Sequence, residues 1–67
     1  MKLVINGDIV DIPYDIKTVS DLLHHFQLHN KGAIVELNHS IIEKNYYNNT
    51  EITDGDKLEI VHFVGGG

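Results

Sequence analysis

The chain opens with two short runs of β-forming apolar residues on either side of a tight turn. The runs are residues 3–5 and 9–12, and Asn6-Gly7 lies between them. Asn-Gly tolerates positive φ at both central positions of a two-residue turn, which is the strongest short-range indication of a β-hairpin. Because proline cannot donate a hydrogen bond to a sheet, Pro13 should close the second strand or lie at a sheet edge. The pattern therefore predicts an N-terminal hairpin.

The next segment changes to helical spacing. Apolar residues recur at i, i+3, i+4 and i+7, namely at Val19, Leu22, Leu23 and Phe26. Thr18 is a candidate N-cap, and Asp21 three residues later completes a weak form of the capping box. Residues 30–32, Asn-Lys-Gly, supply a stop signal. The pattern predicts one amphipathic helix of about 11 residues that begins after Thr18.

The second half of the chain predicts further strands around an irregular connection. Residues 33–38 predict a third strand, and residues 41–42 predict a short strand or a turn. Ile52, between two turn-rich stretches, is predicted to be a buried anchor. Residues 57–64 predict a long last strand that leads directly into the glycines at 65–67. A helix between strands requires a crossover, so the β-β-α-β-β order predicts an α+β domain whose single helix covers one face of a mixed sheet.

The amino-acid composition argues against several classes of function and of binding partner. Among 67 residues there are ten acidic side chains, five lysines, no arginine and no cysteine. Nucleic acid and anionic membranes are unexpected partners, because both need a positive surface, whereas a net charge of -5 suits a basic surface on another protein. The absence of cysteine excludes disulfides, thiolate catalysis and cysteine-ligated zinc. A chain this short favours a carrier, an adaptor or an inhibitor over a free-standing enzyme. Without a signal-peptide core or a membrane-length apolar run, the protein is expected in the cytoplasm.

Five histidines raise the question of a metal site or a catalytic base. His25 and His29 are four residues apart on the predicted helix, where two imidazoles can share an ion, but His24 lies on the other side and no acidic third ligand is near. We therefore expect no metal site and interpret these histidines as solvated. His62 is close to the chain end and is a candidate for contact with an activated carboxylate, although a sheet-face histidine is the favoured interpretation.

The three terminal glycines are unusual, since at a background usage near 7% such a run arises by chance about 0.03% of the time. A disordered end is the simplest interpretation. The functional interpretation is that the terminal carboxylate becomes an acyl donor once it is activated. To reach another protein's active site the chain end would pass through a narrow channel, and glycine lets the channel walls approach the backbone. Each residue adds a reach of about 3.3–3.6 Å. The expectation is a folded domain over residues 1–64 and a flexible tail over residues 65–67.

Five segments together resemble a known family over nearly the whole chain: residues 3–7, 18–23, 35–38, 54–60 and the diglycine end. They are similar to the ubiquitin-like sulfur carriers of β-grasp fold, and most closely to the thiamine-biosynthesis sulfur carrier (ThiS) family. The resemblance implies a β-grasp fold. The diglycine end is common to the whole superfamily, so it is specific for activation of the terminus but not for the pathway.

The resemblance also implies a reaction on the chain end. Gly67 would be adenylated by an E1-like adenylyltransferase of the ThiF type, which uses ATP, and would then become a thiocarboxylate that donates sulfur for thiazole formation. Gly66 and Gly65 would thread into the partner, Gly65 as a spacer. The other implied partners are a sulfur donor such as a cysteine desulfurase and a thiazole synthase of the ThiG type. The protein would bind no cofactor and would act as a co-substrate, not as an enzyme.

The last predicted strand has apolar residues on both faces, with Leu58 and Ile60 on one and Val61 and Phe63 on the other. Either the second face is exposed for docking, or it is buried under the 39–53 segment. Acids near the strand, Asp54, Asp56 and Glu59, would steer a basic partner, unless they only cap turns and maintain solubility. The predicted docking residues are Glu59, Val61 and Phe63.

Other functions remain open at this point. The small subunit of molybdopterin synthase uses the same tail chemistry with another acceptor, although such carriers are usually longer, so the short chain favours thiamine. A ubiquitin-like modifier would join its terminal glycine to a lysine through an isopeptide bond. A β-grasp adaptor with an incidental glycine tail belongs to a different class. A free-standing enzyme ranks last, because no base–nucleophile–oxyanion set can be assembled from these residues.

Overall fold

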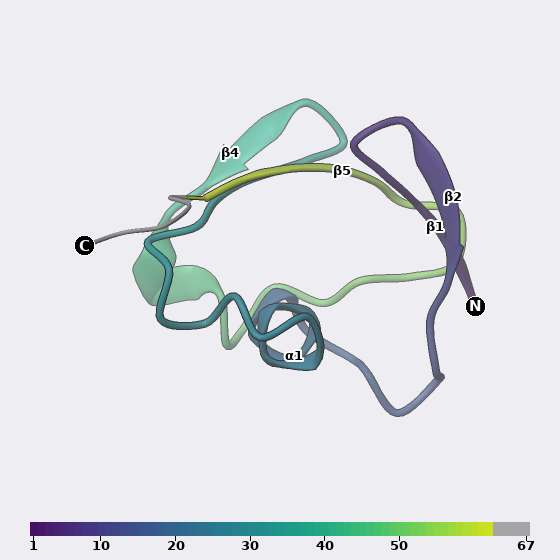
Figure 1. Cartoon of the computed structure of the whole chain (residues 1–67), viewed down its shortest axis with the longest axis horizontal. Helices are drawn as coiled ribbons and strands as arrows, with labels where there is room; N and C mark the ends of the chain where they lie inside the picture. The colour runs from purple at the N-terminus through teal and green to yellow at the C-terminus, as the bar shows by residue number, and fades with distance from the viewer. Residues whose placement is uncertain (63–67) are drawn as a thin grey trace.

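The computed structural model describes residues 1–62 as five strands and one α-helix (Figure 1). The predicted α+β class is confirmed, and residues 41–42 belong to a strand of their own, which adds a fifth strand to the expected order. The elements in chain order are β1 Lys2–Ile5, β2 Asp8–Asp11, α1 Val19–His25, β3 Ile34–Leu37, β4 Ser40–Ile42, the 3-10 turn η1 Lys44–Tyr46, and β5 Lys57–Val61.

The strands form one mixed sheet in the order β2-β1-β5-β3-β4. β1 and β5 run parallel, and every other neighbouring pair is antiparallel. β5, the last strand in the sequence, is therefore the central strand of the sheet. Figure 1 shows α1 and the connections around it on one side of the curved sheet; within residues 1–62, no helix or strand covers the opposite side, which we call the outer face.

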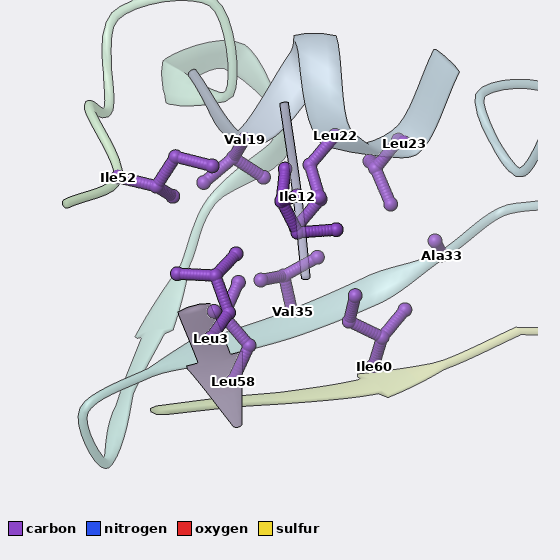
Figure 2. Close-up of a cluster of buried hydrophobic side chains, with 10 residues drawn as sticks. All are labelled: Leu3, Ile12, Val19, Leu22, Leu23, Ala33, Val35, Ile52, Leu58 and Ile60. Carbon is purple, nitrogen blue, oxygen red and sulfur yellow. The ribbon is translucent and has the colours of Figure 1, made fainter. Parts of the chain in front are cut away.

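The core lies between α1 and the inner face of the sheet (Figure 2). Strand side chains alternate between faces, so β5 buries Leu58 and Ile60 and exposes Glu59 and Val61. The predicted anchor Ile52 is confirmed, with 5% of its surface exposed. The buried apolar residues are Leu3, Ile12, Val19, Leu22, Leu23, Ala33, Val35, Ile52, Leu58 and Ile60.

The predicted start of the helix is confirmed. The Asp21 N–H donates to Thr18 Oγ1 (3.1 Å), and Asp21 Oδ2 accepts from the Thr18 N–H (3.2 Å), which completes the capping box. A further hydrogen bond from the Lys17 N–H (3.0 Å) contributes most to lowering the pKa of the Asp21 carboxyl below its ordinary value.

The predicted end of the helix is wrong, because α1 has seven residues and stops before Phe26. Gln27 adopts φ +61°, the Gln27 N–H donates to the His24 carbonyl (3.0 Å), and the Leu28 N–H donates to the Leu23 carbonyl (2.7 Å). This is the Schellman arrangement, which ends a helix one turn before the Asn-Lys-Gly run. Phe26 consequently leaves the apolar stripe and is 37% exposed. Within residues 1–62, no helix is long and apolar enough to cross a membrane.

A β-hairpin lies at each edge of the sheet. The predicted Asn6-Gly7 turn is confirmed, with φ values of +50° and +87° between β1 and β2. A second two-residue turn at Asn38 and His39, with φ values of +49° and +73°, joins β3 to β4. The second turn lacks glycine, so its sequence signal is much weaker than that of the first.

Candidate functional site

The outer face of the sheet carries apolar side chains around the end of β5. Ile34 of β3 pairs in register with Val61 of β5, and the two are 52% and 64% exposed. Ile41 of β4 lies on the same face and is 69% exposed. The structure therefore decides between the two expectations for β5: among the described residues its second face is exposed, and the 39–53 segment does not bury it.

Two carboxylates lie among these apolar residues. Glu36 and Glu59 are direct cross-strand partners in the β3–β5 register, and Ile41 faces Glu36 from β4. Like charges directly opposite one another are destabilising in a sheet. Neither carboxylate forms a hydrogen bond or an ion pair within residues 1–62. We name this surface the outer-face patch; it consists of Ile34, Glu36, Ile41, Glu59 and Val61.

The three acids that were expected to steer a partner have different surroundings. Asp54 Oδ1 accepts a hydrogen bond from the Lys2 N–H (2.6 Å), and Asp56 Oδ2 accepts one from the Thr53 N–H (2.8 Å). Both carboxylates therefore stabilise the turn that precedes β5. Within residues 1–62 the Glu59 carboxylate accepts no hydrogen bond, so it has no such local role, and its contact with a partner stays a prediction.

His62, the last described residue, is half-buried and lines a groove beside the end of β5. The groove has a volume of about 390 Å³, and its apolar wall includes Phe26 and Ile60. Contact between His62 and an activated chain end stays a prediction, since the residues that follow it are not described.

The predicted placement of His25 and His29 on one helix is wrong. Because α1 ends at His25, His29 is not on its surface; the His29 ring instead stacks on His24, with centroids 4.0 Å apart and an angle of 12° between the planes. The nitrogen lone pairs of two parallel rings do not converge on one ion. Within residues 1–62, no three or more potential metal ligands come together.

Several predicted site residues lie outside the described part of the chain. They include the modified residue Gly67, the threading residues Gly65 and Gly66, and the docking residue Phe63. The domain boundary expected after residue 64 lies there too. No local pattern in the sequence assigns Ile34, Glu36 and Ile41 to this surface, because only the strand register places them beside β5.

Comparison with known proteins supports one family for this chain. Residues 3–67 match the ThiS family. The chain is 51% identical over 65 residues to the sulfur carrier protein ThiS of Bacillus subtilis, a match that covers 97% of this chain and 98% of that protein. It is also 43% identical, over its full length, to a segment that makes up 20% of a thiazole synthase from Paramagnetospirillum magneticum.

A solved structure agrees with the architecture. The crystal structure of the thiamine biosynthesis protein (ThiS) from Geobacter metallireducens matches with a TM-score of 0.81 and 30% sequence identity, and the match covers all of both chains. The ubiquitin-like fold that the resemblance implied is confirmed. On the evidence of its sequence and its fold, the chain belongs to the ThiS family.

Proposed function

We propose that this protein is the sulfur carrier of thiamine biosynthesis and that it holds the sulfur on its own carboxyl terminus. One observation carries the proposal: the match to the ThiS family extends from residue 3 through the terminal glycine, Gly67. The position of β5 supports it. The strand before the tail is the central one of the sheet, so the fold gives the chain end a rigid base.

The chemistry takes place on the terminal carboxylate in two steps. First, a carboxylate oxygen of Gly67 attacks the α-phosphorus of ATP; a new P–O bond forms, the bond to the β-phosphate breaks, and pyrophosphate leaves. Hydrosulfide then attacks the carbonyl carbon of the acyl-adenylate, a C–S bond forms, and AMP leaves with the electron pair of the broken C–O bond. The product is a thiocarboxylate, and the carrier contributes no catalytic side chain.

Three partners follow from this chemistry, and each is part of the proposal. An adenylyltransferase of the ThiF type binds ATP and activates Gly67. A donor such as a cysteine desulfurase supplies the sulfur from a persulfide; a thiol attacks the inner sulfur of the persulfide, a disulfide forms, and the outer sulfur leaves as hydrosulfide. A thiazole synthase of the ThiG type receives the sulfur from the carrier, and all three partners act in the cytoplasm. The likeness to a segment of a thiazole synthase supports the thiazole synthase as a partner, because two domains that are fused in one chain commonly serve the same reaction.

The outer-face patch is the proposed docking surface for the enzymes that act on the tail. It combines exposed apolar side chains with two carboxylates that have no ion-pair partner within residues 1–62, and it includes two residues of β5, the strand that leads to the glycines. Both the adenylating enzyme and the sulfur acceptor need the same chain end, so we expect them to compete for overlapping parts of this surface. Apolar contacts should set the dissociation rate, and the carboxylates should set the association rate.

Intact mass tests the carrier function directly. Protein recovered from sulfur-replete cells that contain the partner enzymes should include a species heavier by ~16 Da, the difference between sulfur and oxygen in one carboxylate. Fragmentation should locate the added mass on Gly67. If the entire population has the unmodified mass under these conditions, the protein is not a thiocarboxylate carrier.

Charge reversal at Glu59 tests the docking surface. Glu59→Lys should slow association with at least one partner by roughly threefold or more at low salt, and the defect should shrink as salt rises, because exposed charges are screened over about 8–10 Å near physiological ionic strength. The variant should be as stable as the parent or slightly more so, since it replaces the like-charge pair with Glu36 by an opposite-charge pair.

Glu51→Lys is the matched control, with the same change in charge at an exposed residue on the connection that bridges to Thr18. Stopped-flow association of both variants separates a local effect of the patch from an effect of net charge. Equal slowing by the two variants would show that net charge alone is responsible, and unchanged, salt-independent rates for Glu59→Lys would remove Glu59 from the docking surface.

A further inference from the structure

The side chain of Asn6 extends the sheet beside the end of β5. The parallel pairing of β1 with β5 runs through hydrogen bonds from the Val4 N–H to the Asp56 carbonyl and from the Asn6 N–H to the Leu58 carbonyl, both 2.9 Å. The next bond of this ladder would go to Ile60, but the chain turns away from β5 after Asn6.

The carboxamide of Asn6 supplies the missing bonds. Its Nδ2 donates to the Ile60 carbonyl (3.0 Å), and its Oδ1 accepts from the Ile60 N–H (2.7 Å). The side-chain amide thus bonds to both backbone groups of Ile60, as a peptide group of a neighbouring strand would. On its other edge, Ile60 pairs with Val35 of β3. β5 is therefore held on both edges up to Ile60, seven residues before Gly67.

The turn alone does not require this arrangement. Position 6 needs a residue that tolerates positive φ, and glycine would meet that need without a side chain. Asn38 gives a direct comparison, because it occupies the equivalent turn position between β3 and β4 with φ +49°. Its side chain also makes two hydrogen bonds, to the Lys57 N–H (3.0 Å) and to Asp56 Oδ1 (3.0 Å), but these hold the beginning of β5.

We propose that Asn6 is a positioning residue: it fixes the direction in which β5 leaves the sheet and so orients the terminal carboxylate toward the reacting atoms of the docked adenylating enzyme. The proposal rests on the proposed function. A strand held on one edge only has more freedom to twist and to separate from its neighbours, and a misplacement of about 1 Å at a reacting group can lower a rate by about a hundredfold.

The test compares Asn6→Gly with Asn38→Gly, because glycine keeps the turn conformation at both positions. Each variant loses two side-chain hydrogen bonds: Asn6→Gly loses those to Ile60, and Asn38→Gly loses those to Asp56 and Lys57. ATP–pyrophosphate exchange is measured with a ThiF-type adenylating enzyme while the carrier concentration is varied. For Asn6→Gly we expect kcat to fall roughly tenfold or more with KM nearly unchanged, because docking is intact but the carboxylate is misplaced. For Asn38→Gly we expect both constants to stay near those of the wild type.

Amide hydrogen exchange verifies the structural change without any partner. Asn6→Gly should accelerate exchange of the Ile60 N–H, and Asn38→Gly that of the Lys57 N–H, with similar losses in melting temperature. Should the glycine variant at position 6 fail to fold, Asn6→Asp keeps the acceptor for the Ile60 N–H and places an oxygen against the Ile60 carbonyl. The aspartate variant should also lower kcat.

Equal kcat values for the two glycine variants, or a defect confined to KM, would overturn the positioning role. A wild-type protein that supports no exchange at all would instead overturn the proposed function, and the positioning role with it. The two failures are therefore distinguishable in the same experiment.

Discussion

Blocking the terminal carboxylate should abolish activation of this carrier. With an E1-like adenylating enzyme and ATP, the wild-type protein should support pyrophosphate exchange, whereas a protein that ends in Gly67 amide should support none. The amide nitrogen is a very poor nucleophile toward the α-phosphorus, so no acyl-adenylate can form. Deletion of Gly67 should have the same result, because it moves the carboxylate by about 3.3–3.6 Å, the length of one extended residue.

The folded domain serves as the internal control for both variants. The buried residues of the described core all lie between residues 3 and 60, so neither change should alter the melting temperature or the circular dichroism spectrum. Binding to the adenylating enzyme should also persist, because the outer-face patch is unchanged. Undiminished exchange by the amide would show that the reacting group is not the terminal carboxylate.

Gly66→Val should fold normally and lose most of its adenylation and sulfur transfer. A β-branched side chain widens the chain next to the reacting residue and restricts its φ and ψ, whereas glycine allows enzyme walls to approach the backbone. Single-turnover adenylation and transfer of sulfur to thiazole synthase are the two measurements. Both should fail, since both enzymes must enclose the same chain end.

Gly66→Ala provides a graded comparison, because it adds one methyl group without a branch. If the width of the tail is the cause, the alanine variant should be impaired less than the valine variant with each enzyme. Normal turnover of Gly66→Val with both partners would show that the tail does not pass through a narrow channel.

The two turn asparagines and the glutamates of the outer-face patch test different aspects of the same reaction. Loss of the Asn6 side chain should lower kcat, whereas charge reversal at Glu59 should lower the association rate. These expectations differ because Asn6 contacts the backbone of β5 itself, while Glu59 projects from the exposed face of that strand. A kinetic analysis that separates binding from chemistry can therefore assign each residue to its step.

The sequence by itself determined the features that depend on neighbouring residues. Asn6-Gly7 specified a hairpin because the turn needs two residues that accept positive φ, and Thr18 with Asp21 specified the helix start because both capping bonds lie within four residues. The alternation along β5 correctly assigned Leu58 and Ile60 to one face. The glycine end and the family resemblance indicated the reaction.

Only the tertiary structure decided which distant segments meet. The end of α1 depends on Gln27, which adopts a left-handed conformation. Glutamine is not a residue type that predicts this conformation, so the sequence did not indicate the helix end. The pairing of β3 with β5 and β4 places Ile34, Glu36 and Ile41 on the same face of the sheet as Glu59 and Val61, although they lie 16 to 23 residues before the start of β5. The contact of Asn6 with Ile60 joins positions 54 residues apart. Such pairings are set by the register that buries the whole core at once, and no local window of the sequence contains that information.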